Sequence, residues 1–203
     1  MKPDLILGTL FIAGLLNLDV GGPSAYPYQP AGYYANLQFP DRPYIGDKDE
    51  RQYRRGVYVH WQRTFLHPML ANFDAPSREE CTANRTVSNT PQQALTLLND
   101  PEFVEAARVF AEQIIRRGGR TDEEKLNSAF ETALARPIKA NEKQSLQEFL
   151  AGQRAYYSRN PAESRKLARA GQGPNLGLEE NEVAAWTSVC RVILNLHETI
   201  VRY

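Results

Sequence analysis

The chain has 203 residues, enough for one large domain that buries roughly 70% of the surface its unfolded form exposes. Its 24 basic and 24 acidic residues cancel, which leaves no net field to attract nucleic acid or an anionic membrane. Two cysteines, Cys81 and Cys190, are too few for a disulfide scaffold and lack the paired spacing of a zinc site. We expect two buried free thiols, with a single bridge between them as the alternative.

The first 22 residues resemble an export signal in part. Lys2 precedes an apolar run from Leu5 to Leu18, which is short for a membrane span. Asp4, two internal glycines and the lack of a small-residue cleavage site weaken the signal and anchor interpretations. We expect a buried helix that ends near Asn17, followed by a Gly-Gly turn.

Residues 23–43 read "PSAYPYQPAGYYANLQFPDRP". Five prolines exclude a regular helix, and the tyrosines supply surface to bury. The segment is predicted to be an ordered irregular arm that wraps over other elements, and docking of a partner or of sugar rings is the less common use of such a stretch.

Helical signals accumulate after residue 50. The stretch "RQYRRGVYVHWQRTFLHPML" predicts one helix with Tyr53, Val57 and Trp61 on a face, ending at Pro68. Ser77 and Glu80 stand at capping-box spacing in a short turn beyond it.

The stretch "SNTPQQALTLLNDPEF" contains two helix starts. Thr90 and Gln93 form a capping box with Pro91 in the first helical position, and this helix ends at Asn99. Asp100 then caps a second helix, again followed by proline.

The remaining helices carry apolar stripes. Phe103, Ala107, Phe110 and Ile114 recur every three or four residues up to "RRGG", where Gly118 is expected to take a positive φ. Three further helices are predicted: 121–136, opened by a Thr121 and Glu124 box, 141–157, and a weaker one at 162–170. The last is a core helix with apolar positions Val183, Trp186, Cys190, Ile193, His197 and Ile200.

No period-two alternation competes with these patterns. The predicted fold is therefore all-α, an antiparallel multi-helix bundle with the Pro/Tyr-rich arm wrapping over it. We expect a single domain over 1–203, made of an apolar segment (1–22), the irregular arm (23–49) and the bundle (50–203).

Several stretches together carry a family resemblance: "GGPSAYPYQP", "YRRGVYVHWQRT", "FDAPSREECTANRTVSNTPQQALTLLNDPEFVEAARVFAEQI" and "AAWTSVCRVILNLHETIVR". The chain resembles, from about Leu5 to Tyr203, the planctomycete-specific C-terminal domain of unknown function found in large exported cytochrome c-like multi-module proteins. The resemblance implies a periplasmic or cell-surface location and haem-containing or other modules as neighbours. The chain has no C-x-x-C-H motif, because Thr82, Ala83 and Asn84 follow Cys81, so no haem or other cofactor is expected in it.

The resemblance is strongest in a polar belt from residue 74 to residue 100, which is our candidate site. We expect either an internal hydrogen-bond network or a recognition surface for other modules or a glycan. Asp74, Glu79 and Arg85 could instead serve a carbohydrate-active hydrolase or lyase, and Trp61, Arg63 and His67 form a candidate interaction surface. The belt comprises Asp74, Arg78, Glu79, Arg85, Asn89, Thr90, Gln93, Asn99 and Asp100.

The histidines and hydroxyls have simpler explanations than catalysis. His60 and His67 are seven apart on one predicted helix, a spacing that does not suit a metal pair, and His197 is expected in the core, so no metal is expected. A triad of Ser88, His67 and Asp74 lacks a nucleophile elbow.

Three functions stay open at this stage. The protein is a non-catalytic helical interaction module, a carbohydrate-active component, or a docking surface for a haem-containing redox module with Trp61 and the tyrosines near the contact. The first is preferred over an enzyme, because an active site would need two carboxylates that converge in a pocket.

Overall fold

The computed structural model describes residues 3–33, 43–62, 66–76, 81–83, 88 and 90–200. Within these ranges the chain is helical, with isolated bridges and no strands, so the all-α prediction is confirmed. The elements are α1 (Pro3–Ile12), η2 (Glu50–Tyr53), η3 (Gly56–Tyr58), α2 (Pro68–Asn72), α3 (Pro91–Asn99), α4 (Pro101–Arg117), α5 (Asp122–Leu134), α6 (Ala140–Arg159), α7 (Pro161–Ala168), α8 (Glu180–Leu194) and α9 (His197–Ile200), where η marks a 3-10 helix.

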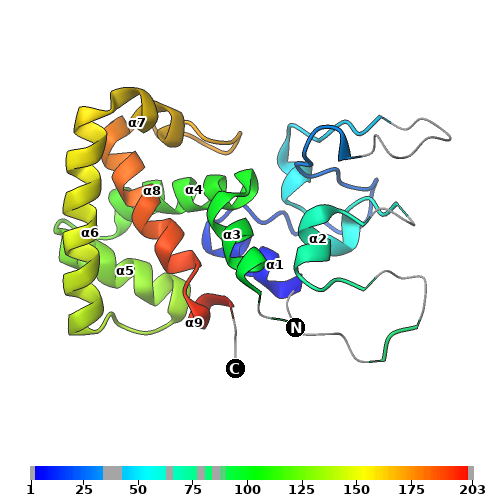
Figure 1. Ribbon diagram of the computed structural model, residues 1–203, viewed down its shortest axis with the longest axis horizontal. Coiled ribbons are helices and arrows are strands. Elements are labelled where there is room, and N and C mark those ends of the chain that lie inside the picture. The colour runs from blue at the N-terminus through cyan, green and yellow to red at the C-terminus, as the bar shows by residue number, and fades with distance from the viewer. Residues whose placement is uncertain are drawn as a thin grey trace.

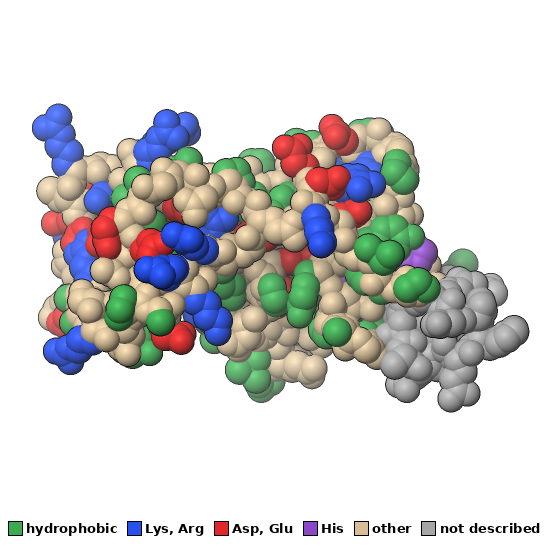
Figure 2. All heavy atoms as spheres, turned by 90° about the horizontal axis from the view of Figure 1, so that it is seen from above, with side chains coloured by type: hydrophobic (Ala, Val, Ile, Leu, Met, Phe, Trp, Pro, Cys, Tyr) green, Lys and Arg blue, Asp and Glu red, His purple; other side chains and the backbone are tan. Residues whose placement is uncertain are grey.

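The helices from α4 onward gather at one end of the molecule, and the irregular segments with α2 form the other end (Figure 1). Seen from above, basic and acidic side chains are interspersed over the helical end, and hydrophobic side chains lie beside a histidine toward the irregular end (Figure 2). Helix α1 and the start of α4 lie between the two ends and join them.

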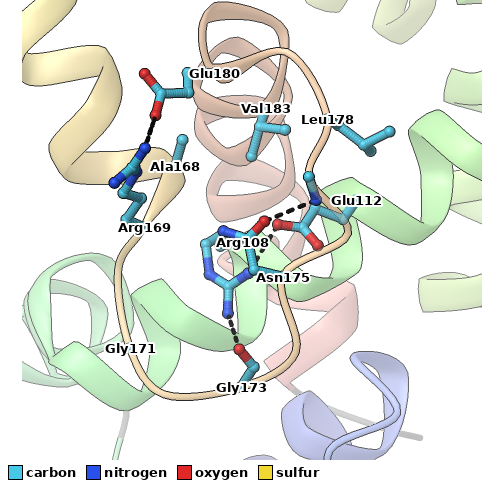
Figure 3. A pocket seen from close by; sticks show the side chains of 11 residues that line it. Arg108, Glu112, Ala168, Arg169, Gly171, Gly173, Asn175, Leu178, Glu180 and Val183 are labelled. Atoms are coloured by element: carbon cyan, nitrogen blue, oxygen red, sulfur yellow. Dashed lines mark hydrogen bonds and ion pairs between the residues drawn. The ribbon is translucent and has the colours of Figure 1, made fainter.

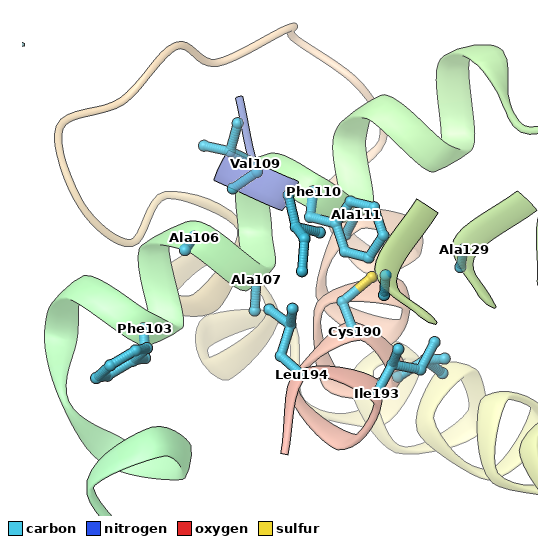
Figure 4. Packing of buried hydrophobic residues seen from close by; sticks show 14 of the residues in the cluster. Phe103, Ala106, Ala107, Val109, Phe110, Ala111, Ala129, Cys190, Ile193 and Leu194 are labelled. Atoms are coloured by element: carbon cyan, nitrogen blue, oxygen red, sulfur yellow. The ribbon is translucent and has the colours of Figure 1, made fainter. Parts of the chain in front are cut away.

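The core lies between α4 and α8, which make the most extensive contact in the molecule. The predicted stripe is buried: Phe110 and Ala107 of α4 are fully enclosed, as is Trp186 of α8. Cys190 and Ile193 of α8 belong to the same core cluster (Figure 4). Burial of a large apolar side chain such as Phe110 or Ile193 contributes about 1.5–3 kcal/mol to folding. The periodicity of both helices therefore predicted their buried faces correctly.

The helix starts follow the capping signals. Both capping boxes, at Thr90 with Gln93 and at Thr121 with Glu124, are formed, and Asp100 caps α4 by accepting the Glu102 N–H at 3.0 Å. At the end of α4, however, Gly119 rather than Gly118 has the positive φ, of +122°.

A single arginine joins the starts of α5 and α8 to the middle of α6. Arg154 donates to Asp122 at 2.5 Å and to Glu182 at 2.5 Å, and Glu182 also accepts the Trp186 indole N–H at 2.9 Å. The two carboxylates at helix starts also suit the positive ends of the helix dipoles.

The predicted helix from residue 51 to Pro68 is wrong over the described residues 51–62 and 66–67. The chain forms η2 and η3 and then runs extended, because the backbone of the arm takes the hydrogen bonds that a helix would need: Ala25 N–H bonds to Tyr58 O and His60 N–H to Ala25 O, each at 2.8 Å. Pro68 begins α2 instead of ending a helix, which is the position where its missing N–H is harmless.

The first and last predicted helices are shorter than expected. Helix α1 stops at Ile12, and Gly14 turns the chain with a φ of +65°, so residues 15–17 leave the helix. At the other terminus Thr199 donates its hydroxyl to Ile193 O, which separates α8 from α9. His197 is consequently exposed, not part of the core stripe.

Only one of the two thiols is buried. Both cysteines are free, Cys190 lies in the core where burial raises the pKa of its thiol, and Cys81 is exposed, so the expectation of two buried thiols is half wrong.

Candidate functional site

The polar belt begins with a corner that connects α2 to α3. Asp74 has a left-handed φ of 59°, and its carboxylate accepts the Ser88 N–H at 2.8 Å and the Ser88 hydroxyl at 2.7 Å. Gln93 donates to Asn72 O at 2.8 Å and to Ser88 Oγ at 3.0 Å. These contacts hold two short helices at a fixed angle, which is a structural use of the residues.

A Ser88–His67–Asp74 triad is not assembled. His67 donates its Nε2–H to Tyr28 O at 2.9 Å, and Ser88 donates to Asp74 directly. The remaining predicted belt and surface residues, Arg63, Arg78, Glu79, Arg85 and Asn89, lie outside the described residues.

The other end of the belt lines a cavity of about 340 Å³, which we call the Tyr28 cavity. It lies where the arm meets α2 and α3, so the structure brings the predicted residues His67, Asn99 and Asp100 together from distant parts of the sequence. Its apolar walls are Pro30, Pro68, Met69 and Leu95, and its polar walls are Tyr28, His67, Asn72, Gln92, Thr96, Asn99 and Asp100.

Burial shifts the pKa values of His67 and Asp100 in these walls. His67 is only 4% exposed, and burial lowers its pKa to about 4, so its imidazole is neutral at physiological pH and does not form part of an exposed surface. Burial raises the pKa of Asp100, although the bond from the Glu102 N–H partly opposes this. Trp61, the other described member of the predicted interaction surface, is half-buried against the core.

The arm is fixed to the start of α4 beside this cavity. Glu102 is buried and accepts the Tyr28 N–H at 3.0 Å. Desolvation, with Asp100 and Glu105 nearby, raises the pKa of its carboxyl well above the ordinary value. Tyr28 is thereby held at both its N–H and its carbonyl, while its side chain stays 43% exposed.

A second polar region, on α4 itself, was not predicted. Glu102, Glu105, Arg108 and Glu112 form a buried polar stripe beside the apolar one. Arg108 donates to the carbonyls of Ala170, Gly173 and Pro174 and to Glu112 at 2.7–3.0 Å (Figure 3). This network holds the loop 169–178 against α4.

The two flanking carboxylates bind the backbone N–H groups of the same loop. Glu105 accepts from Gln172 and Gly173 and also from the Tyr53 hydroxyl, and Glu112 accepts from Leu176 at 2.9 Å. A cavity of about 490 Å³ lies beside this loop, and Arg108 and Glu112 are in its wall. Because Arg108 donates to four acceptors of the chain itself, its guanidinium is committed to the fold. Arg169, the other arginine among the described residues of this cavity, pairs with Glu180.

The sequence does contain a signal for this region. Charged residues at 102, 105, 108 and 112 repeat every three or four positions along a helix whose other residues from 101 to 111 are apolar, and so share one face. Such a face usually points to solvent, which is why the pattern did not suggest burial. Three of the four acceptors of Arg108 are backbone carbonyls, which no sequence pattern reveals.

The described residues contain neither a metal-binding cluster nor a membrane-spanning helix. Among the described residues, no group of three or more His, Cys, Asp or Glu side chains is placed to hold a metal ion. None of the described helices has both the length and the apolar character needed to cross a bilayer.

The fold and cavities define an all-α domain with a polar recess between an irregular arm and two short helices. The chain belongs to the PSD1 family, described as protein of unknown function (DUF1553), which matches residues 5–150. Neither the curated proteins nor the solved structures that were compared yield a match. The family stretch includes the Tyr28 cavity and ends within α6, before the loop 169–178 and α8.

Proposed function

We propose that the protein is a non-catalytic helical interaction module that binds other modules, including a haem-containing one, in an exported multi-module assembly. The export and the haem-containing neighbour come from the resemblance to the C-terminal domain of planctomycete cytochrome c-like proteins. What the structure contributes is a surface suited to such a contact.

The observation that carries the proposal is a group of exposed aliphatic side chains at the irregular end. Leu18, Val20, Ile45 and Val57 are 62%, 83%, 76% and 63% exposed. Single exposed apolar residues are ordinary, but several on adjoining turns mark an interaction surface. We call these four residues the aliphatic end.

Hydrogen bonds hold the segments that carry Leu18, Val20 and Val57 side by side, and the segment of Ile45 is bonded to the arm through Asp47 N–H and Tyr26 O at 2.7 Å. Asn17 N–H bonds to Tyr53 O at 3.1 Å, and Gly21 N–H to the Tyr58 hydroxyl at 3.2 Å. Arg54, which is buried, donates to the carbonyls of Asp19, Gly21 and Pro23 and lies over the Tyr58 ring. The aliphatic end therefore sits on a backbone that is already ordered, which lowers the entropic cost of binding.

The described acidic residues of the belt favour binding over catalysis. Asp74 is engaged by Ser88 and Gln93, and Asp100 by the N–H of Glu102. An acid–base pair would need two carboxylates that face one substrate atom, and these two serve separate helix junctions.

The proposal is tested by passing extract of the source cells over the immobilised chain and assaying retained proteins for covalently bound haem. A doubly substituted Val20→Asp/Val57→Asp chain should lose at least ninety per cent of the retained haem protein, because charge is not tolerated inside an apolar contact. The control is Tyr156→Asp, which places a carboxylate at a residue on α6 that is 50% exposed. Equal retention by all three chains, or no retained haem protein, contradicts the proposal.

A further inference from the structure

The hydrogen-bonding atoms of the Tyr28 cavity are mostly acceptors. Asn72 uses its amide nitrogen on Thr96 Oγ1 and Asn99 uses its own on Leu95 O, each at 2.9 Å, so both side-chain Oδ1 atoms are left to accept. Asp100 accepts the Glu102 N–H with Oδ1, so its Oδ2 atom is also left to accept a hydrogen bond. A ligand that fits this wall must bring several donors.

Two donors complete the wall. The Tyr28 hydroxyl and the Gln92 side-chain amide form no hydrogen bonds within the described part of the chain. A ligand group that both donates and accepts would use these donors as well as the three oxygens, and a hydroxyl group is the simplest such group.

The charge of the cavity disfavours an anion and does not require a cation. Among the described residues that line the cavity, Asp100 is the only carboxylate, and the neutral His67 adds no positive charge. An ammonium group would pair with Asp100 but would leave the Tyr28 hydroxyl and the Gln92 amide N–H groups without acceptors. A neutral polyhydroxyl ligand leaves none of these groups unsatisfied.

The apolar surfaces of the cavity suit the C–H face of a sugar ring. Tyr28 presents a half-exposed ring, Leu95 is 59% exposed, and Pro30 stands beside them in the wall. An aromatic residue with an apolar body and a polar tip is adapted to a surface that is wet on one side only. The volume of about 340 Å³ lies at the small end of the roughly 300–1,000 Å³ usual for ligand sites.

We infer that the Tyr28 cavity binds a single ring of a neutral glycan, with Tyr28 against its C–H face and the oxygens of Asn72, Asn99 and Asp100 accepting from its hydroxyls. This deepens the proposed function and rests on it, because it makes the module a binder that holds glycan without cleaving it. The cavity and the aliphatic end have no residue in common, so a substitution in one leaves the residues of the other unchanged.

The inference is tested by titration calorimetry of the full chain with cellobiose, xylobiose, mannobiose, galactobiose and chitobiose. At least one should bind, and Tyr28→Ala should weaken that binding by about tenfold or more. This change removes only a half-exposed side chain, since Tyr28 is anchored through its backbone. The matched control, Tyr156→Ala, removes a tyrosine of similar exposure on α6 and should bind as the unaltered chain does.

The Asp100→Asn variant tests whether the cavity binds a neutral sugar or a cation. Asparagine caps a helix about as well as aspartate, so α4 should keep its start while the cavity loses its charge. Sugar binding should stay within about threefold, because the amide oxygen still accepts. Binding of n-butylamine that is abolished by this change would overturn the inference, as would no binding of any of the five disaccharides or equal sugar binding by Tyr28→Ala.

The same samples distinguish failure of the inference from failure of the proposed function. Disaccharide that is bound and then cleaved, detected by chromatography of the sugar, overturns the non-catalytic function and leaves the sugar site in place. Retention of haem protein by a chain that binds none of the disaccharides leaves the proposed function in place and overturns the glycan inference.

Discussion

The two faces of α4 are built on opposite principles within one helix. Toward α8 the helix presents Phe110 and Ala107, which pack by shape and size (Figure 4), and Ile114 is buried in the same core cluster. Toward the loop 169–178 it presents Arg108 and its carboxylate neighbours, which act through directed hydrogen bonds (Figure 3). The first face tolerates small changes of volume, whereas the second tolerates no missing partner.

The largest effect is expected from Arg108→Ala. This change leaves Glu112 buried without its cation and three loop carbonyls without a donor, so the free energy of unfolding should fall by about 3–5 kcal/mol. Urea denaturation measures the loss. Arg116→Ala, at an exposed position near the end of the same helix, is the control and should cost less than about 0.5 kcal/mol. Similar losses for the two variants would show that the polar face contributes little.

A pH dependence should arise from Glu102, because the pKa of its carboxyl is raised in the folded protein. Above the ordinary value of 4.5 the unfolded chain has released this proton while the native chain still holds it, so stability falls as pH rises toward the raised pKa. Glu102→Gln keeps an acceptor for the Tyr28 N–H and removes the titration. The variant should gain stability over the unaltered chain progressively as pH rises.

His67 acts in the opposite direction on the acidic side. Its pKa of about 4 lies below the ordinary 6.5, so stability rises with pH between these values. Denaturation of the unaltered chain and Glu102→Gln should therefore be compared at equal pH from 5 to 9, where the contribution of His67 cancels. A difference in stability that does not change with pH contradicts the assignment to Glu102.

The smallest effect is expected on the apolar face. Ile114→Val removes one buried methylene and should lower the free energy of unfolding by about 0.5–1.5 kcal/mol. Hydrogen exchange of the loop 169–178 sharpens the comparison: Arg108→Ala should accelerate exchange there before global unfolding, and Ile114→Val should not. Equal acceleration in both variants would mean that the two faces are not independent.

The sequence predicted what depends on local chemistry. Capping boxes at Thr90 and Thr121 and the stripe through Phe110 depend on residues within one or two turns, and all were confirmed. Prediction from the sequence failed where contacts with distant backbone determine the structure. Residues 51–62 have a helical pattern, but they form hydrogen bonds with Ala25 instead of a regular helix.

The sequence identified some residues of the candidate site but did not predict how they are arranged in space. Asn99, Asp100 and His67 were singled out, but their meeting around one cavity depends on Tyr28, which is 39 residues from His67. The glycine-rich loop over Arg108 could not be assigned from the sequence, because the contacts of Arg108 with it are to main-chain oxygens.

Because these contacts use main-chain atoms of the loop, they require the Arg108 side chain of α4 but no particular side chain of the loop. Arg108 holds the loop through carbonyl groups that every amino acid possesses, so the side chains of Gln172 or Pro174 can change without loss of a bond to it. What the loop cannot change is its length, since one residue more or fewer would move three carbonyls out of register with a single guanidinium. Relatives that keep this arrangement should agree in the residue count of the loop and keep Gly171, where a Cβ atom would overlap Glu105 Cδ. Positions such as Gln172 and Pro174 should vary.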